Sequence, residues 1–335
     1  MTVDSTFHEA AVFEDLARLV AIPTVSPMSK EELDGAEAFL TEWGCRRRAS
    51  DFFTRGHPAS QVWIYTHVDT KPPGPRSEWR SNPFALVCVE DRWVGLGTSD
   101  SKAQLLNTLA VAGPDDFVIV DACEEQDGSG SVGRFIREHA PDTLVIVDGA
   151  SPKGVEYFTG LSGQMDALVK LDTGFLPSHP ARSTTDVSHI LMRFLDQARD
   201  SCRHLTVTGL WGPGQERSLS LQEVSVRVDL RFHPKQRAEV ITLAETWPME
   251  IRQFMLPVSG REDVRLPAHV CGGIANFSSR LSTLDAQISP RRVVVVPGAD
   301  IDNRNHQPNE FIRPERMATH RVTLRSILRA LRESQ

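Results

Sequence analysis

Residues 61–69 read QVWIYTHVD, an apolar, β-favouring run that stops on a histidine and an aspartate. Three later runs also lead to acids or a histidine: FVIV (117–120) before DACEE, LVIV (144–147) before Asp148, and VVVV (293–296) before a glycine-containing loop to His306. Short runs of this composition are typical of buried parallel strands. In open α/β sheets, functional groups gather beyond the carboxyl ends of such strands. The four runs therefore predict one sheet with a shared polar edge.

The segments around these runs predict helices. Helical patterns cover residues 7–21, 30–43, 102–112, 129–139 and 313–332. In the last of these segments the arginines are expected on a solvated face. Strand and helix alternate through Asp148, which predicts an α/β domain with a mainly parallel sheet.

The pattern changes after about residue 156. Residues 224–232 (VSVRVDLRF) alternate strictly, as a half-exposed strand does. Strands are also expected at 165–171 and 204–210, and helices at 186–198 and 241–250. The chain thus predicts a discontinuous α/β metal-binding catalytic domain, residues 1–155 and 268–335, with a smaller α+β domain inserted at 156–267.

Composition narrows the class of protein. The 335 residues carry a formal net charge of -7, which argues against a nucleic-acid partner. The longest apolar runs are far shorter than the roughly 20 residues of a membrane span, so no membrane partner is expected. The acidic N-terminal segment lacks a signal-peptide pattern, and five scattered cysteines suggest no disulfide framework. These features predict a cytoplasmic protein.

The residues at the expected strand ends have metal-ligand chemistry. Histidine, aspartate and glutamate are the nitrogen and oxygen ligands of zinc, and cobalt or manganese would suit them as well. His67 and Asp69, two positions apart on one strand, point the same way. Glu124 and Glu125 would project oppositely in extended backbone, so that one binds metal while the other accepts a proton from water. Asp100 follows a glycine-rich turn, where its carboxylate can bridge two ions. Each piece alone is ordinary, for instance a helix N-cap at Asp100. Their joint occurrence favours a dinuclear metal enzyme.

At this point the sequence resembles a known family of metallopeptidases. The family includes acetylornithine deacetylase, succinyl-diaminopimelate desuccinylase, aminoacylase and carboxypeptidase G. The matching stretches are IPTVSP (22–27), THVDT (66–70), EWRSNPF (78–84), GLGTSDSK (95–102), CEEQDGSGS (123–131), VIVDGA (145–150) and PGADIDNRNHQPNEFI (297–312). Together they cover most of the chain in order. The last stretch and GGIANFSSR (272–280) look most like acetylornithine deacetylase.

The resemblance implies a role for each matching residue. His67, Asp100 and Asp148 would hold one zinc ion, and Asp100, Glu125 and His306 the other. Asp69 would orient His67, Glu124 would be the general base, and His179 would reach the oxyanion across a dimer. Arg231, Gly273 and Asn276 would contact the substrate. The inserted domain would be the family's lid and dimerisation domain, so a homodimer is implied.

The expected activity is hydrolysis of an N-acyl amino acid by metal-activated water, as in acetylornithine deacetylase. Three alternatives stay open. A dipeptidase or carboxypeptidase would use the same ligands on a peptide with a free α-amine. A further variant releases an amino acid from an amino-group carrier protein. A non-catalytic metal-binding relative is the remaining alternative, and the intact Glu124 argues against it.

Overall fold

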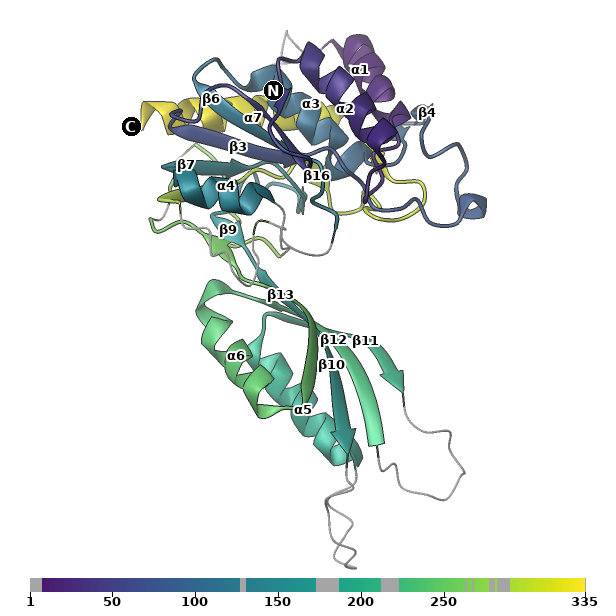
Figure 1. Ribbon diagram of the computed structural model, residues 1–335, viewed down its shortest axis with the longest axis vertical. Helices are drawn as coiled ribbons and strands as arrows, with labels where there is room; N and C mark the ends of the chain where they lie inside the picture. The colour runs from purple at the N-terminus through teal and green to yellow at the C-terminus, as the bar shows by residue number, and fades with distance from the viewer. Residues whose placement is uncertain are drawn as a thin grey trace, which may run out of the picture. The chain divides into compact units, whose positions relative to one another are not determined.

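The four apolar runs form strands of one sheet in the computed structural model, which describes residues 8–126, 131–172, 187–211, 223–262, 264–266, 268–276, 281 and 290–334. The strand order is β1 (Arg46–Arg47), β2 (Phe52–Arg55), β6 (Asp116–Asp121), β3 (Val62–His67), β7 (Thr143–Ile146) and β15 (Arg292–Val295). β6, β3, β7 and β15 run parallel, while β1 and β2 are antiparallel additions at one edge. The expected mainly parallel α/β sheet is confirmed (Figure 1).

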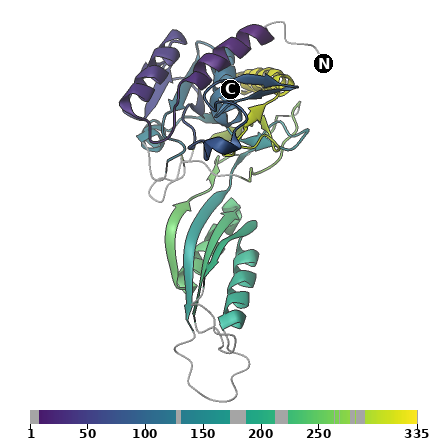
Figure 2. The same cartoon turned by 90° about the vertical axis from the view of Figure 1, so that its right-hand side faces the viewer.

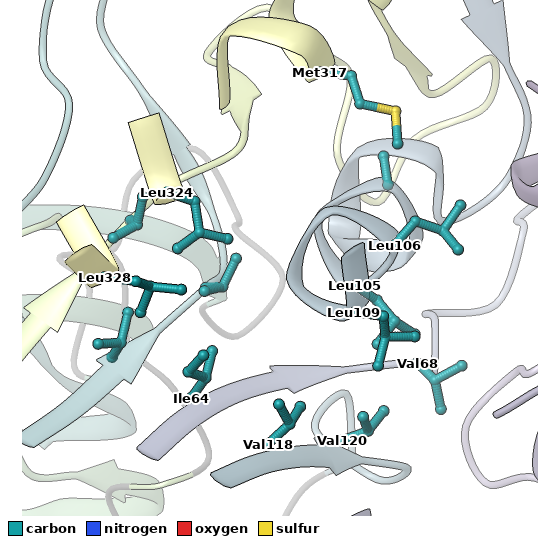
Figure 3. Packing of buried hydrophobic residues seen from close by; sticks show 14 of the residues in the cluster. Ile64, Val68, Leu105, Leu106, Leu109, Val118, Val120, Met317, Leu324 and Leu328 are labelled. Atoms are coloured by element: carbon teal, nitrogen blue, oxygen red, sulfur yellow. The ribbon is translucent and has the colours of Figure 1, made fainter. Parts of the chain in front are cut away.

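Both faces of this sheet are buried, which explains why its strands read as unbroken apolar runs. On one face, Ile64 and Val118 pack with leucines of α3 (Ala103–Val111) and α7 (Pro314–Glu333), as Figure 3 shows. On the other face, the rings of Trp63 and Phe117 lie 4.5 Å apart and meet Phe135 of α4 (Ser131–His139). Packing on both faces therefore holds the strands in place, and the residues at the strand ends are positioned by the same packing.

This sheet belongs to the first compact unit of the chain, residues 1–160, 259–275 and 288–335 as far as they are described, whose first two helices lie close to the expected ranges. α1 (Glu9–Ala21) ends just before Pro23, and α2 (Lys30–Glu42) begins with a capping box between Ser29 and Glu32. Shorter elements complete the unit: η1 (Arg76–Glu78), the sheet of β4 (Val87–Val89), β5 (Arg92–Val94) and β17 (Phe311–Ile312), and the pair β8 (Ala150–Ser151) and β16 (Ala299–Asp300). A further short pair joins β9 (Gly160–Leu161) to β14 (Val258–Ser259), at two of the places where the chain passes from one compact unit to the other.

One expectation about α7 is only partly correct, because Arg329 and Arg332 are exposed but two other arginines are not. Its arginines were expected on a solvated face, yet Arg321 is only 6% exposed and donates to Asn107 Oδ1 on α3 at 2.9 Å. Arg316 is also drawn inward, where it donates to the carbonyl oxygen of Pro297 at 2.9 Å. Each of these two guanidinium groups therefore donates at least one hydrogen bond, which links α7 to α3 or to the loop after β15.

A second compact unit comprises residues 161–258 and 276–287 as far as they are described. Its sheet is antiparallel throughout, in the order β11 (His204–Trp211), β12 (Glu223–Phe232), β10 (Gly163–Asp172) and β13 (Met249–Met255). Helices α5 (Val187–Ser201) and α6 (Arg237–Thr246) lie on one face (Figure 2). Along β12, buried residues facing the helices alternate with more exposed polar ones, as the sequence pattern predicts.

The helix expected over 241–250 is only partly correct. α6 follows the short η4 turn (Pro234–Gln236) and ends at Thr246. Trp247 is extended, and β13 starts at Met249. Pro248 accounts for the early end, because the residue before a proline is pushed out of the helical region. None of the helices in the described part of the chain combines the length and apolarity of a bilayer span.

Candidate metal centre

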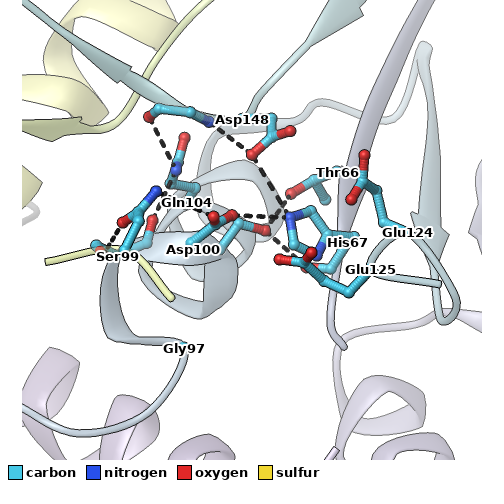
Figure 4. A network of polar contacts seen from close by, with 12 residues as sticks. Thr66, His67, Gly97, Ser99, Asp100, Gln104, Glu124, Glu125 and Asp148 are labelled. Carbon is cyan, nitrogen blue, oxygen red and sulfur yellow. Dashed lines mark hydrogen bonds and ion pairs between the residues drawn. The ribbon is translucent and has the colours of Figure 1, made fainter. Parts of the chain in front are cut away.

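His67 is the last residue of β3 and lies at the centre of a cluster of acids. Its Nε2 atom is 3.1 Å from Asp100 Oδ1 and 3.5 Å from Asp148 Oδ1. All three residues are buried, and each offers a ligand atom within 4.8 Å of the others. Figure 4 shows Asp100, Asp148, Glu124 and Glu125 arranged around the imidazole. The ends of β3 and β7 and the turn at residues 98–102 thus bring together residues that are 33 to 81 positions apart in sequence.

A second group shares Asp100 with the first. His306 Nε2 is 3.1 Å from Asp100 Oδ2 and 2.9 Å from Glu125 Oε1, and these atoms also lie within 4.8 Å of one another. Asp100 therefore presents one carboxylate oxygen to each group. His306 is 48% exposed, whereas the residues of the first group are buried. The shared carboxylate is the geometry that a bridging ligand between two cations requires.

Glu124 and Glu125 both point toward His67, which corrects the expectation that they project oppositely. They occupy a turn after β6 rather than extended backbone, and with His67 they form a third group of potential ligand atoms. Burial raises the pKa of Glu124 well above its ordinary value, and the charge of Glu125 raises it further against the opposing effect of His67. A carboxyl group of this kind is suited to accept and release a proton near neutral pH.

Asp69 organises the same turn through its carboxylate. Oδ1 accepts the backbone N–H of Glu124 at 3.0 Å, and Oδ2 accepts that of Glu125 at 2.9 Å. Ser26 donates its hydroxyl to Oδ2 as well. The imidazole of His67 has its Nδ1 atom 3.1 Å from the Asp69 carbonyl oxygen. Asp69 thus holds the backbone of both glutamates through its carboxylate and contacts the Nδ1 atom of His67 through its carbonyl oxygen.

Glu310 holds the turn that carries Asp100, a role that the strand and helix pattern of the sequence does not indicate. Its carboxylate accepts the backbone N–H groups of Gly97, Ser99 and Asp100 at 2.9, 2.9 and 3.0 Å, and the hydroxyl of Ser99 at 2.8 Å. Burial raises the pKa of Glu310 to about 7, with a contribution from the Asp100 charge. The signal for this role in the sequence is that Glu310 directly precedes the buried pair Phe311–Ile312. A carboxylate buried at such a position needs several hydrogen-bond donors.

Two further features shape this turn, which runs from Thr98 to Lys102 as η2 with non-helical backbone at Asp100. Asn305 donates to Asp100 Oδ2 at 3.0 Å, so the loop of His306 also contacts the shared carboxylate. Gly97 has a φ of +74°, and a Cβ atom there would lie 2.5 Å from Thr70 Cγ2. Glycine at 97 is therefore required for the sharp entry into the turn.

The donor set fits two divalent cations. Burial opposes protonation of His67, yet hydrogen bonds to Asp100, Asp148 and Asp69 raise its pKa well above the ordinary value. The pKa of His306 is likewise raised to about 11 against the effect of burial, chiefly by hydrogen bonds to Asp100 and Glu125. The acids therefore stabilise positive charge at both imidazole positions, and bound metal ions would supply that charge.

Of the other expected site residues, one falls outside the described residues and three belong to other segments of the chain. His179 falls within 173–186, which the structure does not describe. Arg231 belongs to β12 of the second unit, where its Nε donates to Asp229 Oδ1 at 3.1 Å. Gly273 has a φ of +78° and accepts the backbone N–H of Thr159 at 2.7 Å, and Asn276 is exposed.

Comparison with known proteins places this geometry in a class. The sequence matches Peptidase family M20/M25/M40 over residues 63–330, which is more than half of the chain. The chain therefore belongs to this peptidase family.

Part of the chain is also similar in sequence to individual proteins. The chain is 28% identical over 155 residues to the succinyl-diaminopimelate desuccinylase of Bordetella avium (strain 197N), covering 43% of this chain and 40% of that protein. The enzyme of the same name from Bordetella petrii is 27% identical over 165 residues, covering 46% and 41%. The matched stretches thus span less than half of these relatives' own length.

Two solved structures share the fold over nearly the whole chain. The M20 family metallo-carboxypeptidase Sso-CP2 from Sulfolobus solfataricus gives a TM-score of 0.64 at 14% identity, covering 96% of this chain and 99% of that one. Human carnosine dipeptidase 1 gives 0.60 at 15% identity, covering 95% and 96%. At such identities the likeness establishes the fold alone.

Proposed function

We propose that the chain is a metal-dependent amidohydrolase that removes the acyl group from an N-acyl amino acid. The observation that carries this proposal is the pair of ligand groups sharing Asp100, with the carboxyl group of Glu124 beside them. Membership of the peptidase family supports the reaction class. The desuccinylase relatives support an acyl amino acid as substrate, and acetylornithine deacetylase-like specificity is the form that we favour.

The proposed metal ligands are the two groups described above. His67, Asp100 and Asp148 would hold one ion, and Asp100, Glu125 and His306 the other. Zinc is the first choice, although cobalt or manganese would be accepted by the same ligands. When bound, two such ions supply Lewis acidity, which acidifies water and polarises an amide carbonyl.

The protein's own residues would then handle protons and orientation. Glu124 accepts a proton from the attacking water and returns it to the leaving amine, a role for which its raised pKa is suited. Asp69 keeps Glu124 and Glu125 in place through their backbone N–H groups. His179 is proposed as the donor that stabilises the oxyanion, reaching the site from a partner subunit. Arg231, Gly273 and Asn276 are proposed to contact the amino-acid part of the substrate.

A homodimer is part of this proposal, and features of the second unit support it. β11 is an edge strand among the described strands, and its Val207, Leu210 and Trp211 side chains are exposed. An edge strand with exposed apolar side chains is a natural place for a second copy to pair. The size of particles in solution, measured by light scattering, tests this part independently of activity.

The central test is Glu124→Gln in zinc-loaded protein. We expect turnover to fall by about 10³-fold or more, because the amide cannot accept the proton, while the zinc content stays at the wild-type value. Glu138→Gln, an exposed residue of α4, is the matched control and should keep wild-type turnover. Normal turnover in Glu124→Gln would show that another group is the base.

The substrate class is tested by a panel of amides. N-acetyl, N-succinyl and γ-glutamyl amino acids are compared with dipeptides carrying a free α-amine, using product detection after metal reconstitution. An acyl amino acid hydrolase acts on the first set, whereas a dipeptidase requires the free amine of the second. Hydrolysis of the dipeptides alone would replace the proposed substrate class by the peptidase alternative.

A further inference from the structure

Lys71 brings a positive charge to the edge of the metal centre. It follows THVDT directly, so the loop after β3 delivers it beside the same acids. Its Nζ donates to the backbone carbonyl oxygen of Glu125 and lies 3.2 Å from Glu125 Oε2. The side chain of Lys71 is 38% exposed, while that of Glu125 is 5% exposed. The ammonium group therefore lies on the solvent side of a buried carboxylate.

The contacts leave Lys71 able to bind a ligand. A lysine ammonium has three N–H donors, and the contacts with Glu125 account for two of them. The other oxygen of Glu125, Oε1, is directed to His306 instead, so Lys71 and the second ligand group use different oxygens. The ammonium group is thus close to the reaction centre without occupying the ligand atom.

A cation at this position can favour the binding of an anionic substrate. The five carboxylates of Asp69, Asp100, Glu124, Glu125 and Asp148 outnumber the four positive charges of two bound divalent ions, so an anionic substrate still meets a net negative charge there. A fixed positive charge offsets that repulsion and attracts a carboxylate through a charge-assisted hydrogen bond. Because Glu125 already holds the side chain in place, less conformational entropy is lost when the substrate binds.

We infer that Lys71 is a substrate-binding residue, which recognises a carboxylate near the scissile amide and disfavours a free α-ammonium group at that position. This inference rests on the proposed function and narrows it to carboxylate-bearing acyl amino acids. The carboxylate has two possible sources, the α-carboxylate of the amino acid and the distal carboxylate of a succinyl group.

The test compares matched substrates in wild-type protein and in Lys71→Met. N-acetyl and N-succinyl forms of the best amino acid in the panel are each assayed as the free acid and as the α-carboxamide. We expect Lys71→Met to reduce the preference for the carboxylate-bearing substrate about 10- to 100-fold, mainly through KM, as for a lost hydrogen bond between charged groups. Lys71→Arg should retain part of the preference, and Lys153→Met, at an exposed lysine of the same unit, should retain all of it.

The pattern of loss identifies the source of the carboxylate. A loss confined to the acid-over-carboxamide ratio assigns Lys71 to the α-carboxylate, and a loss confined to the succinyl-over-acetyl ratio assigns it to the acyl group. Equal losses for all four compounds, or a parallel loss of bound zinc measured by mass spectrometry, would mean that Lys71 only positions Glu125. That result, like an unchanged preference, would overturn the inference.

A binding measurement keeps this test separate from the proposed function. In the Glu124→Gln background, calorimetry gives Kd for the same four compounds with and without Lys71→Met. If wild-type protein hydrolyses none of the panel, the proposed function fails, yet a carboxylate-specific rise in Kd would still support Lys71. If hydrolysis occurs and Kd shows no carboxylate-specific change, the inference about Lys71 alone is wrong.

Discussion

The two sheets of this chain differ in how many of their faces are buried. The sheet of the first unit has apolar residues packed on both faces, and the acids of its described strands lie at the first or last residue of a strand or in the turns that follow. The sheet of the second unit is covered by α5 and α6 on one face, and its other face carries polar residues such as Asp166 and Arg227. Both sheets carry charged residues, but the charges have different surroundings.

The difference in burial makes the polar edge of the first sheet a reactive environment, whereas the open face of the second sheet is an ordinary protein surface. Carboxylates at the buried edge of the first sheet have few waters to solvate them, so their pKa values shift and positive charge is attracted strongly. Carboxylates on the open face of the second sheet stay solvated and gain little from a neighbouring arginine. The same residue type should therefore respond very differently to substitution in the two places.

The largest effect is expected for Asp100→Asn. This change removes the charge that both ligand groups share, so bound zinc should fall from two ions per chain to one or fewer, and turnover should fall by about 10³-fold or more. Zinc is measured by mass spectrometry after dialysis, and turnover with the best substrate of the panel.

The matched control in the other sheet is Asp166→Asn. Asp166 also pairs with a cation, Arg227, but on the half-exposed face of β10. We expect its zinc content and turnover to equal those of the wild type. Two ions retained by Asp100→Asn would contradict the bridging role of this carboxylate.

Much of the first sheet could be predicted from the sequence because burial on two faces leaves a strong pattern. The runs at 61–65, 117–120, 144–147 and 293–296 fall on β3, β6, β7 and β15. The second sheet was also recognisable, since burial on one face makes 224–232 alternate. The end of α6 was missed because Pro248 acts through backbone sterics, which apolar periodicity does not contain.

The candidate site was predictable only in part. The residues at strand ends, such as His67 and Asp148, were found because parallel strands share one carboxyl edge. Glu310 and Lys71 were missed because their contacts join loops that are far apart in sequence, and no periodic pattern records such contacts. The inward arginine Arg321 was misjudged for the same reason, since its partner Asn107 lies on another helix.

An intermediate effect is expected for Glu310→Gln. The amide of glutamine would direct N–H donors at the backbone N–H groups of Gly97, Ser99 or Asp100, so the turn that carries Asp100 should loosen. Affinity for zinc should fall about 10- to 100-fold, as for other residues that orient metal ligands. Competition with a chelator measures this affinity. Glu262→Gln, an exposed acid paired with Arg291, should leave it unchanged. Equal affinities in the two variants would remove Glu310 from the site.

The smallest effect compares two ion pairs of nearly equal geometry. Arg332 and Arg227 each donate from Nε to one carboxylate oxygen at 3.0 Å and from Nη2 to the other, with Asp116 and Asp166 as partners. The arginines are similarly exposed, but Asp116 is 1% exposed and Asp166 is 15% exposed. Burial of the remaining carboxylate should therefore decide the cost of removing each arginine.

Arg332→Met leaves Asp116 buried with one partner fewer, so the free energy of unfolding should fall by about 1–3 kcal/mol. Arg227→Met leaves Asp166 in contact with water, and the fall should be roughly 0–1 kcal/mol. Urea denaturation followed by fluorescence measures both, and the slopes should match that of the wild type. Equal losses would mean that the geometry of the ion pair, rather than burial of the carboxylate, determines how much the pair stabilises the fold. The difference in burial between the two sheets would then matter at the metal centre but not for ion pairs elsewhere in the sheets.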